Sequence, residues 1–216
     1  IRGTKVPLPI SSVMKIDNNR VLSTTSYAWV WALAKFMDTH PRYQKRWRNL
    51  SKLVLKQDFN DRFRRSFRRD WHQLNAEWQL FTSTLAYGHD IPREAIDFQP
   101  GESLSGAKTV AMDAACGWQP TAIAVKEGDT LRFTPRGRFI IGREPDGTPW
   151  PCEAGGITLA YHAGRPLGQL LAIIDHGKSF GQPFAIGLGG NIQMPADGTM
   201  YLRLNDSPAK LAENKG

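Results

Sequence analysis

The 216-residue chain has few cysteines and no long apolar segment. Its two cysteines, Cys116 and Cys152, are too few for a disulfide framework, and one bridge or two free thiols both fit the sequence. No apolar run approaches the ~18–20 residues that a membrane-spanning helix needs, so no transmembrane segment is expected. A charged, then apolar, then small-residue leader is also missing, and the chain begins at Ile1, as expected for a mature product or an excised piece.

Complete catalytic signatures are missing as well. No His-Glu-x-x-His occurs, and the five histidines show no metal-ligand spacing. The glycine-rich stretch 186–190 lacks a P-loop lysine and predicts a strand with a bulge or a tight turn. Cys152 and His162 could serve as nucleophile and base, but no third group that would orient them is evident. We therefore expect no catalysis from this chain by itself.

Positive charge is concentrated in one segment. The formal net charge is +8, and Arg42 to Arg69 contains eleven Lys or Arg against Asp58 and Asp61. Three interpretations are open: solvated helix faces covering an aromatic core, phosphate binding on nucleic acid or another anionic surface, and an interface with the rest of a larger protein. A nucleic-acid partner is the less expected, because no helix-turn-helix, zinc-finger or RNA-binding signature is present.

The N-terminal half has helical periodicity. Hydroxyl residues suited to an N-cap precede a largely apolar run at 23–37, and Pro41 predicts a break and a restart. Phe59, Phe63 and Phe67 repeat every four residues and predict one apolar stripe. A further helix is expected from Asp70 to a stop at Gly88, with its core-facing seam formed by Trp71, Leu74, Trp78, Phe81 and Leu85.

The C-terminal half has a period of two. Apolar residues alternate with others at 122–125, 130–134 and 200–204, and Gly, Pro and Asp turns lie between these runs. We therefore predict an α+β protein with a helical domain at 1–95 followed by an all-β sandwich at 96–216, of the jelly-roll or galactose-binding-like kind.

Residues 105–216 resemble the calcium-dependent galactophilic lectins of bacteria. The motifs that carry the resemblance are Gly117-Trp118-Gln119, Val125-Lys126-Glu127-Gly128-Asp129, Arg136-Gly137-Arg138-Phe139, Gly164-Arg165-Pro166-Leu167-Gly168-Gln169-Leu170 and the terminal Tyr201-Leu202-Arg203-Leu204-Asn205-Asp206. The resemblance implies a Ca²⁺ ion held by Asp206, the carbonyl of Lys210, Glu213, Asn214 and the carbonyl of Ile141.

This ligand set suits calcium on chemical grounds. Calcium takes six to eight hard oxygen ligands at about 2.3–2.6 Å. Two carboxylates, one amide oxygen and two carbonyls would supply five and neutralise the ion, which leaves positions for water or for two sugar hydroxyls. Two other interpretations of this tail stay open: a short helix over 207–216 with a Ser N-cap, and a simple strand-ending turn at 205–208.

Aromatic and polar residues upstream could contact the sugar. Trp150, Tyr161, His162 and Arg165 are candidates for a sugar-facing wall, because aromatic faces suit the apolar side of a pyranose. Alternatively, the segment 150–152 closes a loop over the core.

A second resemblance covers residues 20–85. Ser26-Tyr27-Ala28-Trp29-Val30-Trp31-Ala32-Leu33, Phe63 to Phe67 and Leu74-Asn75-Ala76-Glu77-Trp78-Gln79-Leu80-Phe81 are similar to the C-terminal helices of gluzincin-like zinc peptidases of unknown function. That similarity implies a catalytic helix upstream of Ile1.

The functional prediction is a calcium-assisted carbohydrate-binding module, with a galactose-like ligand, in a larger exported protein that is extracellular, periplasmic or on the cell surface. One alternative is a non-catalytic portion of a zinc peptidase, and another is nucleic-acid or anionic-surface binding by the basic helices.

Overall fold

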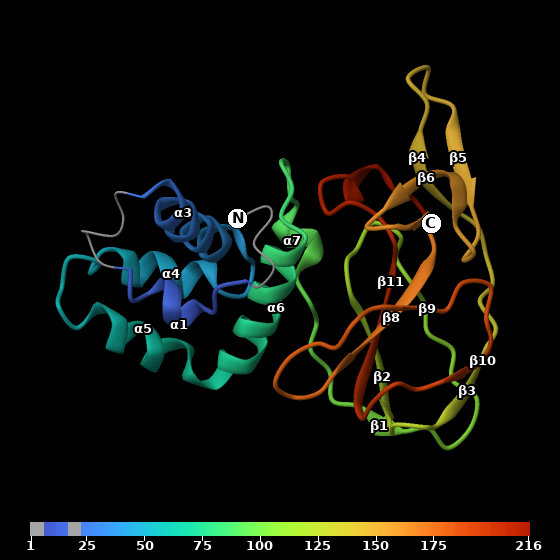
Figure 1. Ribbon diagram of the computed structural model, residues 1–216, viewed down its shortest axis with the longest axis horizontal. Coiled ribbons are helices and arrows are strands. Elements are labelled where there is room, and N and C mark those ends of the chain that lie inside the picture. Colours follow the sequence, from blue (N-terminus) through green and yellow to red (C-terminus); the bar gives the residue numbers. More distant parts are fainter. Residues whose placement is uncertain (1–6, 17–22) are drawn as a thin grey trace. The chain divides into compact units, whose positions relative to one another are not determined.

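The computed structural model describes residues 7–16 and 23–216 of the chain. Its contacts divide the chain into two compact units, Ile1–Leu85 and Ala86–Gly216. The first unit is helical and the second is mostly β (Figure 1), which confirms the predicted α+β class. The units divide between Leu85 and Ala86, N-terminal to the boundary that the sequence placed after residue 95. Within the described residues, no helix is both long enough and apolar enough to cross a bilayer.

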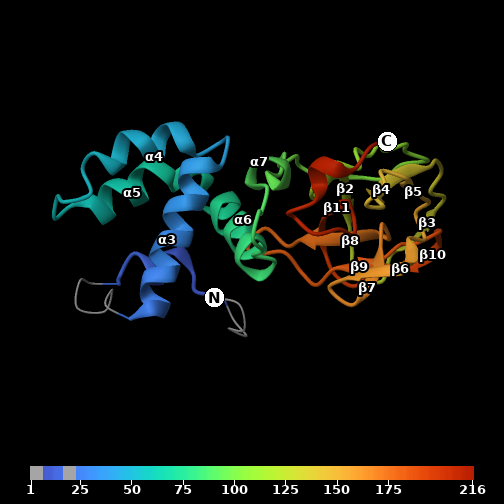
Figure 2. The ribbon, with the colours of Figure 1, turned by 90° about the horizontal axis from the view of Figure 1, so that it is seen from above.

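The helices of the first unit are α1 (Ile10–Val13), α3 (Thr24–Thr39), α4 (Gln44–Ser51), α5 (Phe59–Phe67), the 3₁₀ turn η1 (Arg68–Asp70) and α6 (Trp71–Ser83). Of these, α3, α5 and α6 begin close to the predicted positions. Ser23 caps α3, since its hydroxyl oxygen accepts a hydrogen bond from Ser26 N at 3.1 Å. The proline break is confirmed, because α3 ends at Thr39 and α4 starts at Gln44. α4 and α5 lie side by side (Figure 1 and Figure 2).

The predicted stop of the last helix at Gly88 is wrong. α6 ends at Ser83, because the hydroxyls of Ser83 and Thr84 both donate to the carbonyl of Leu80, at 2.9 and 2.8 Å. These bonds satisfy a carbonyl at the helix end and compete with a further helical turn.

The second unit contains one larger sheet and three two-stranded sheets. The strands are β1 (Glu102–Ser103), β2 (Gln119–Val125), β3 (Thr130–Phe133), β4 (Phe139–Arg143), β5 (Pro149–Cys152), β6 (Ile157–His162), β7 (Arg165–Leu167), β8 (Leu170–Asp175), β9 (Phe184–Ala185), β10 (Gly190–Gln193) and β11 (Gly198–Leu204). The large sheet has the order β1-β2-β11-β8-β9, and the pairs are β3–β10, β4–β5 and β6–β7. Short helical segments accompany them at α7 (Ile91–Glu94) and η2 (Leu211–Glu213).

Apolar residues of the large sheet form the core of this unit. Buried side chains from β2, β8 and β11 make one cluster, and Leu131 and Phe133 of β3 and Ile192 of β10 pack against it. The β3–β10 pair therefore covers one face of the large sheet. The stretch 186–190 forms a tight turn, in which Gly189 N donates to the carbonyl of Ile186 at 3.0 Å.

The last strand of the sequence lies in the middle of the sheet. β11 pairs antiparallel with β2 on one side and with β8 on the other. Its C-terminal end therefore emerges at the centre of the sheet, and the final segment 205–216 folds over that end. This placement positions the candidate site.

Candidate functional site

The tail after β11 is folded by turns and not by a regular α-helix. Only the 3₁₀ turn η2 interrupts it, so the alternative of an ordinary helix over 207–216 is wrong. The side-chain amide of Asn205 donates to the carbonyls of His162, Arg165 and Pro166, each at 3.0 Å. This single side chain therefore ties the start of the tail to the β6–β7 hairpin.

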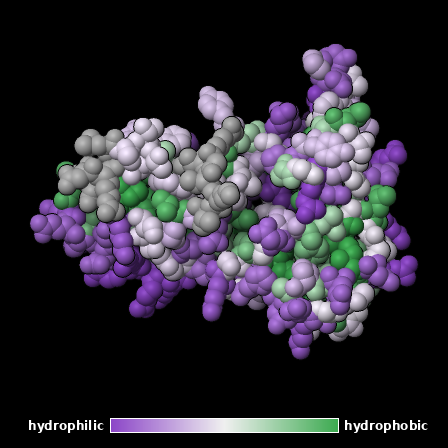
Figure 3. Space-filling model, in the orientation of Figure 1, coloured by the Kyte–Doolittle hydropathy of each residue, from purple (hydrophilic) through white to green (hydrophobic). Residues whose placement is uncertain are grey.

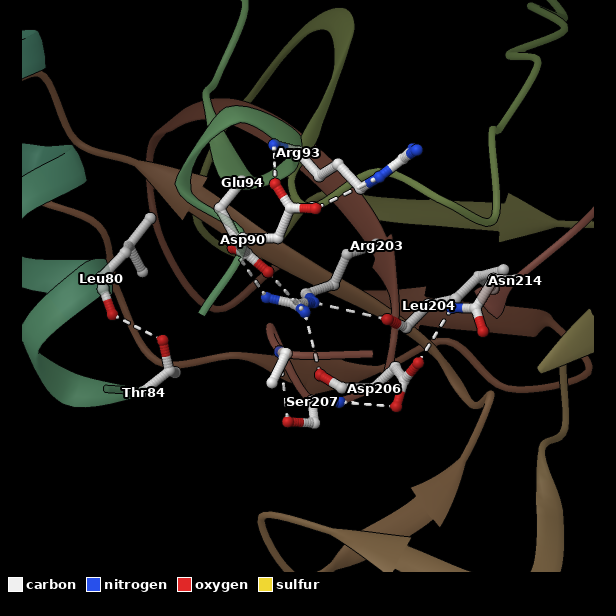
Figure 4. Close-up of polar contacts among 12 residues, drawn as sticks. Leu80, Thr84, Asp90, Arg93, Glu94, Arg203, Leu204, Asp206, Ser207 and Asn214 are labelled. Atoms are coloured by element: carbon white, nitrogen blue, oxygen red, sulfur yellow. Dashed lines mark hydrogen bonds and ion pairs between the residues drawn. The ribbon is translucent and has the colours of Figure 1, made fainter. Parts of the chain in front are cut away.

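Two of the five predicted metal ligands are in direct contact. The Asn214 Nδ2 group donates to Asp206 Oδ2 at 2.9 Å (Figure 4). It also donates to the carbonyl of Ala114 at 3.1 Å. The other oxygen of Asp206 accepts from Ser207 N at 2.6 Å. Asp206 is only 1 % exposed, and Asn214 is buried too. The Asn214 Oδ1 atom is buried and has no hydrogen-bond partner among the described residues.

The other three predicted ligands lie on the same tail or on the strand beside it. The carbonyl of Lys210 accepts from Glu213 N at 2.9 Å, while the side chain of Glu213 is exposed. Two hydrogen bonds pair Lys215 with Ile140, at 2.7 and 3.0 Å, so the next residue of β4, Ile141, lies close to the tail in the pairing register. The fold thus brings Asp206 and Asn214 together, and it places Lys210, Glu213 and Ile141 on neighbouring segments without bringing the exposed Glu213 carboxylate into contact with that pair.

Burial dominates the electrostatics of Asp206. Desolvation raises the pKa of its carboxyl group above the usual value of 3.8, although the Asn214 and Ser207 hydrogen bonds and the charges of Arg203 and Lys210 act in the opposite direction. A cation beside this carboxylate would favour its charged form. A divalent ion at this position would therefore offset the cost of burying the Asp206 carboxylate in its charged form.

Two of the predicted ligands have the donor chemistry that calcium requires. A buried carboxylate and an unpartnered buried amide oxygen are hard donors of the kind that calcium prefers. Within residues 7–16 and 23–216, no three His, Cys, Asp or Glu side chains gather into a metal-binding group. The predicted set contains only two such side chains, and it takes its other donors from amide and carbonyl oxygens.

The candidate sugar-binding residues lie on two hairpins. Trp150 belongs to β5, where its Nε1 donates to Glu144 Oε1 at 2.7 Å and its ring packs on Gly142. Tyr161 and His162 end β6, and Tyr161 is exposed. The Arg165 guanidinium donates to the carbonyl of Pro183 at 2.9 Å.

The charges of Arg203 and Glu94 both act on His162. Burial, and then the Arg203 cation, lower the pKa of its imidazole, while Glu94 acts in the opposite direction. Burial and the Arg203 charge thus both favour the neutral form of the His162 imidazole.

A buried ion pair beside the site was not expected from the sequence. Arg203 is 5 % exposed, and its guanidinium contacts both carboxylate oxygens of Glu94, at 3.1 and 3.3 Å. It also donates to the carbonyl of Asp206 at 3.1 Å and lies over the Trp118 ring, 5.4 Å from its centroid. The alternation along β11 gives no signal for this burial, because an arginine between apolar residues predicts a solvent-facing position.

Both cysteine thiols are free, and neither is activated. Burial raises the pKa of Cys152 to about 11, and it also raises the pKa of Cys116. Cys152 is buried, and its Sγ donates to the carbonyl of Glu153 at 3.1 Å. The arrangement gives no support to the pairing of Cys152 with His162 as nucleophile and base.

The thiols predict a simple labelling result. At pH 8 a thiol with a pKa of about 11 is ionised in roughly one molecule in a thousand. We expect a Cys116→Ser variant to react with iodoacetamide at Cys152 at least about 100-fold more slowly when native than when unfolded in urea. Mass spectrometry of the labelled protein measures both rates, and equal rates would contradict the buried, protonated state.

Comparison with known proteins does not assign the chain to a family, because it matches no family model and no curated protein.

Proposed function

We propose that the β unit is a calcium-assisted carbohydrate-binding module. The observation that carries this proposal is the buried Asn214 Oδ1 atom, which has no partner in the described chain and belongs to a side chain hydrogen-bonded to the buried Asp206 carboxylate. Such orphan oxygens are rare in folded proteins, and a bound cation would satisfy this one.

Asp206, Asn214, Glu213 and the carbonyls of Lys210 and Ile141 would hold the ion. Calcium supplies open coordination positions, which two neighbouring hydroxyls of a galactose-like sugar can occupy. In the chain itself, the Asn205 amide fixes the β6–β7 hairpin beside the tail. Tyr161 on that hairpin offers an exposed aromatic face to the apolar side of the sugar. Binding of this kind needs no catalytic group.

A calcium titration tests the metal part of this proposal. We expect calcium at about 100 times its Kd to stabilise the native protein by about 2.7 kcal/mol, which raises the Tm of the β unit by several degrees. Asp206→Ala should abolish the shift, whereas Asp146→Ala, at an exposed position in the β4–β5 loop, should keep it. Differential scanning calorimetry provides the readout, and an unchanged Tm of the native protein would remove calcium from the proposal.

The same shift should depend on pH. Because the pKa of Asp206 is raised in the folded state, the stability due to its protonated form is present below about 3.8 and is lost as the pH rises through the folded value. Calcium competes with that proton. We therefore expect the calcium-dependent gain in Tm to be full above the folded pKa and to vanish as the pH falls through it.

The sugar part has a separate test. A glycan array probed with and without a calcium chelator should show galactose-type binding that the chelator removes. A calcium-dependent Tm without any glycan signal would leave a metal site and remove the lectin function.

A further inference from the structure

The turn between α4 and α5 exposes two apolar side chains at its tip. Lys56 N donates to the carbonyl of Leu53 at 2.9 Å, which makes Val54 and Leu55 the central residues of the turn. Leu55 is 96 % exposed and Val54 is 56 % exposed. Gly, Pro, Asn, Asp and Ser are the usual residues at turn corners. Two large apolar side chains there contribute nothing to the folded core of this unit.

Exposed positive charge lies next to these two residues and continues along the helix that follows them. Lys52 and Lys56 flank them and are exposed. Exposed arginines then follow along the solvent-facing side of α5 and η1, and they form no ion pair with any described residue: Arg64, Arg65, Arg68 and Arg69. Figure 3 shows hydrophilic side chains along the lower edge of the helical unit, where Figure 1 draws α5.

Some arginines of this segment are already paired with carboxylates and are not available to bind an anionic partner. Three carboxylates each take one guanidinium, in the pairs Arg46–Asp70, Arg48–Asp38 and Arg62–Asp58. These pairs leave six exposed cations between the turn and η1 outside any ion pair with a described residue: Lys52, Lys56 and the four arginines named above. The carboxylate of Asp61 lies among them, and Asp58 also attracts Arg65, so the segment keeps a net positive charge that is smaller than this number.

The base of the turn is held by aromatic packing. The Trp47 ring of α4 contacts Phe59 and Phe63 of α5 edge to face, with centroids 6.3 and 6.2 Å apart. Phe63 is fully buried and anchors this contact in the core. This packing joins α4 and α5, the two helices on either side of Val54 and Leu55, and so fixes the position of the turn that carries these two residues.

We propose that this tip binds an anionic lipid surface. Val54 and Leu55 would enter the boundary between headgroups and acyl chains, while the lysines and arginines contact acidic headgroups. The apolar pair distinguishes this partner from a nucleic acid, because a phosphate backbone offers nothing to two aliphatic side chains at the tip. The inference concerns the helical unit and does not depend on the calcium site.

Vesicle co-sedimentation of the full chain tests this inference. We expect partitioning onto vesicles of phosphatidylcholine with about 30 % phosphatidylglycerol to exceed that onto pure phosphatidylcholine by at least about tenfold. The difference should shrink as salt rises, because exposed charges are screened.

Two variants separate the apolar and the electrostatic contributions. Val54→Ser with Leu55→Ser leaves the charge unchanged and should lower partitioning by about tenfold. Arg65→Gln with Arg68→Gln should lower it by about tenfold on anionic vesicles only. The matched controls are Leu159→Ser, at an 84 % exposed apolar position of β6, and Arg132→Gln with Arg136→Gln, at exposed positions of the β unit; both should bind like the native chain.

Three results would overturn the proposal. The first is equal partitioning of the native chain onto the two vesicle types. The second is native-like binding by the Val54→Ser, Leu55→Ser variant, which would leave only non-specific charge attraction. The third is salt-sensitive binding to a DNA duplex without binding to vesicles.

Discussion

Replacing Arg203 by alanine is expected to lower the free energy of unfolding of the β unit by about 3–5 kcal/mol. The substitution leaves the Glu94 carboxylate, whose side chain is 11 % exposed, without its ionic partner. It also removes the hydrogen bond to the Asp206 carbonyl and the cation–π contact with Trp118. Native-state hydrogen exchange of the β11 amides measures this unit by itself.

Two comparisons identify the source of that loss. The double variant Arg203→Met with Glu94→Leu should be less destabilised than the sum of the single substitutions by about 1–3 kcal/mol, because no charge is left unpaired. The exposed pair Arg138–Glu153 is the matched control, and Arg138→Ala should cost no more than about 1 kcal/mol. A cost below about 1 kcal/mol for Arg203→Ala would contradict a structural role for the buried pair.

Replacing Glu77 by alanine is expected to destabilise the helical unit by about 3 kcal/mol. Glu77 is 4 % exposed on α6, and its carboxylate accepts a hydrogen bond from the Tyr43 hydroxyl at 2.5 Å. His40 Nε2 lies 3.1 Å from Glu77 Oε1, and the Arg42 guanidinium lies 3.8 Å from Glu77 Oε2. Alanine would leave the buried Tyr43 hydroxyl without this acceptor and would remove the carboxylate that lies beside His40.

The protonation of Tyr43 supports this expectation. Burial raises the pKa of its hydroxyl, and the Glu77 charge raises it further, so the hydroxyl remains a donor throughout the physiological range. Glu77→Gln keeps an acceptor and loses the charge, so its cost should be smaller than that of Glu77→Ala. The control on the same helix is Gln79→Ala, at an exposed position, which should change stability by no more than about 0.5 kcal/mol. Hydrogen exchange of the α6 amides is the measurement, and equal costs for Glu77→Ala and Gln79→Ala would refute the role of this cluster.

The helices were predictable because their signals are local. Phe59, Phe63 and Phe67 are four residues apart, and that spacing alone places them on one side of a helix whatever lies next to it. The exception was the end of α6. There the hydroxyls of Ser83 and Thr84 donate to the carbonyl of Leu80 and end the helix before the glycine that the sequence suggested as its stop.

The candidate site was predictable only in part. The resemblance pointed to residues 205–216, and the structure folds this tail so that Asp206 and Asn214 touch. The tail is stabilised by partners far away in sequence, such as the carbonyl of Ala114, 100 residues from Asn214. No periodicity along the chain encodes a contact of that kind. The calcium and sugar functions remain proposals for the same reason, since they depend on how distant oxygens converge.

The amino-acid sequence by itself determined the α+β class, the order of helices before strands, the alternating strands and the concentration of positive charge between Arg42 and Arg69. Tertiary structure alone decided that β11 lies between β2 and β8, and that Arg203 is buried against Glu94, 109 residues away. Local patterns follow from the period of the backbone, which each residue shares with its near neighbours. The choice of strand neighbours follows from the packing of the whole unit, and that choice determines whether a charged side chain between apolar neighbours meets solvent or a buried partner.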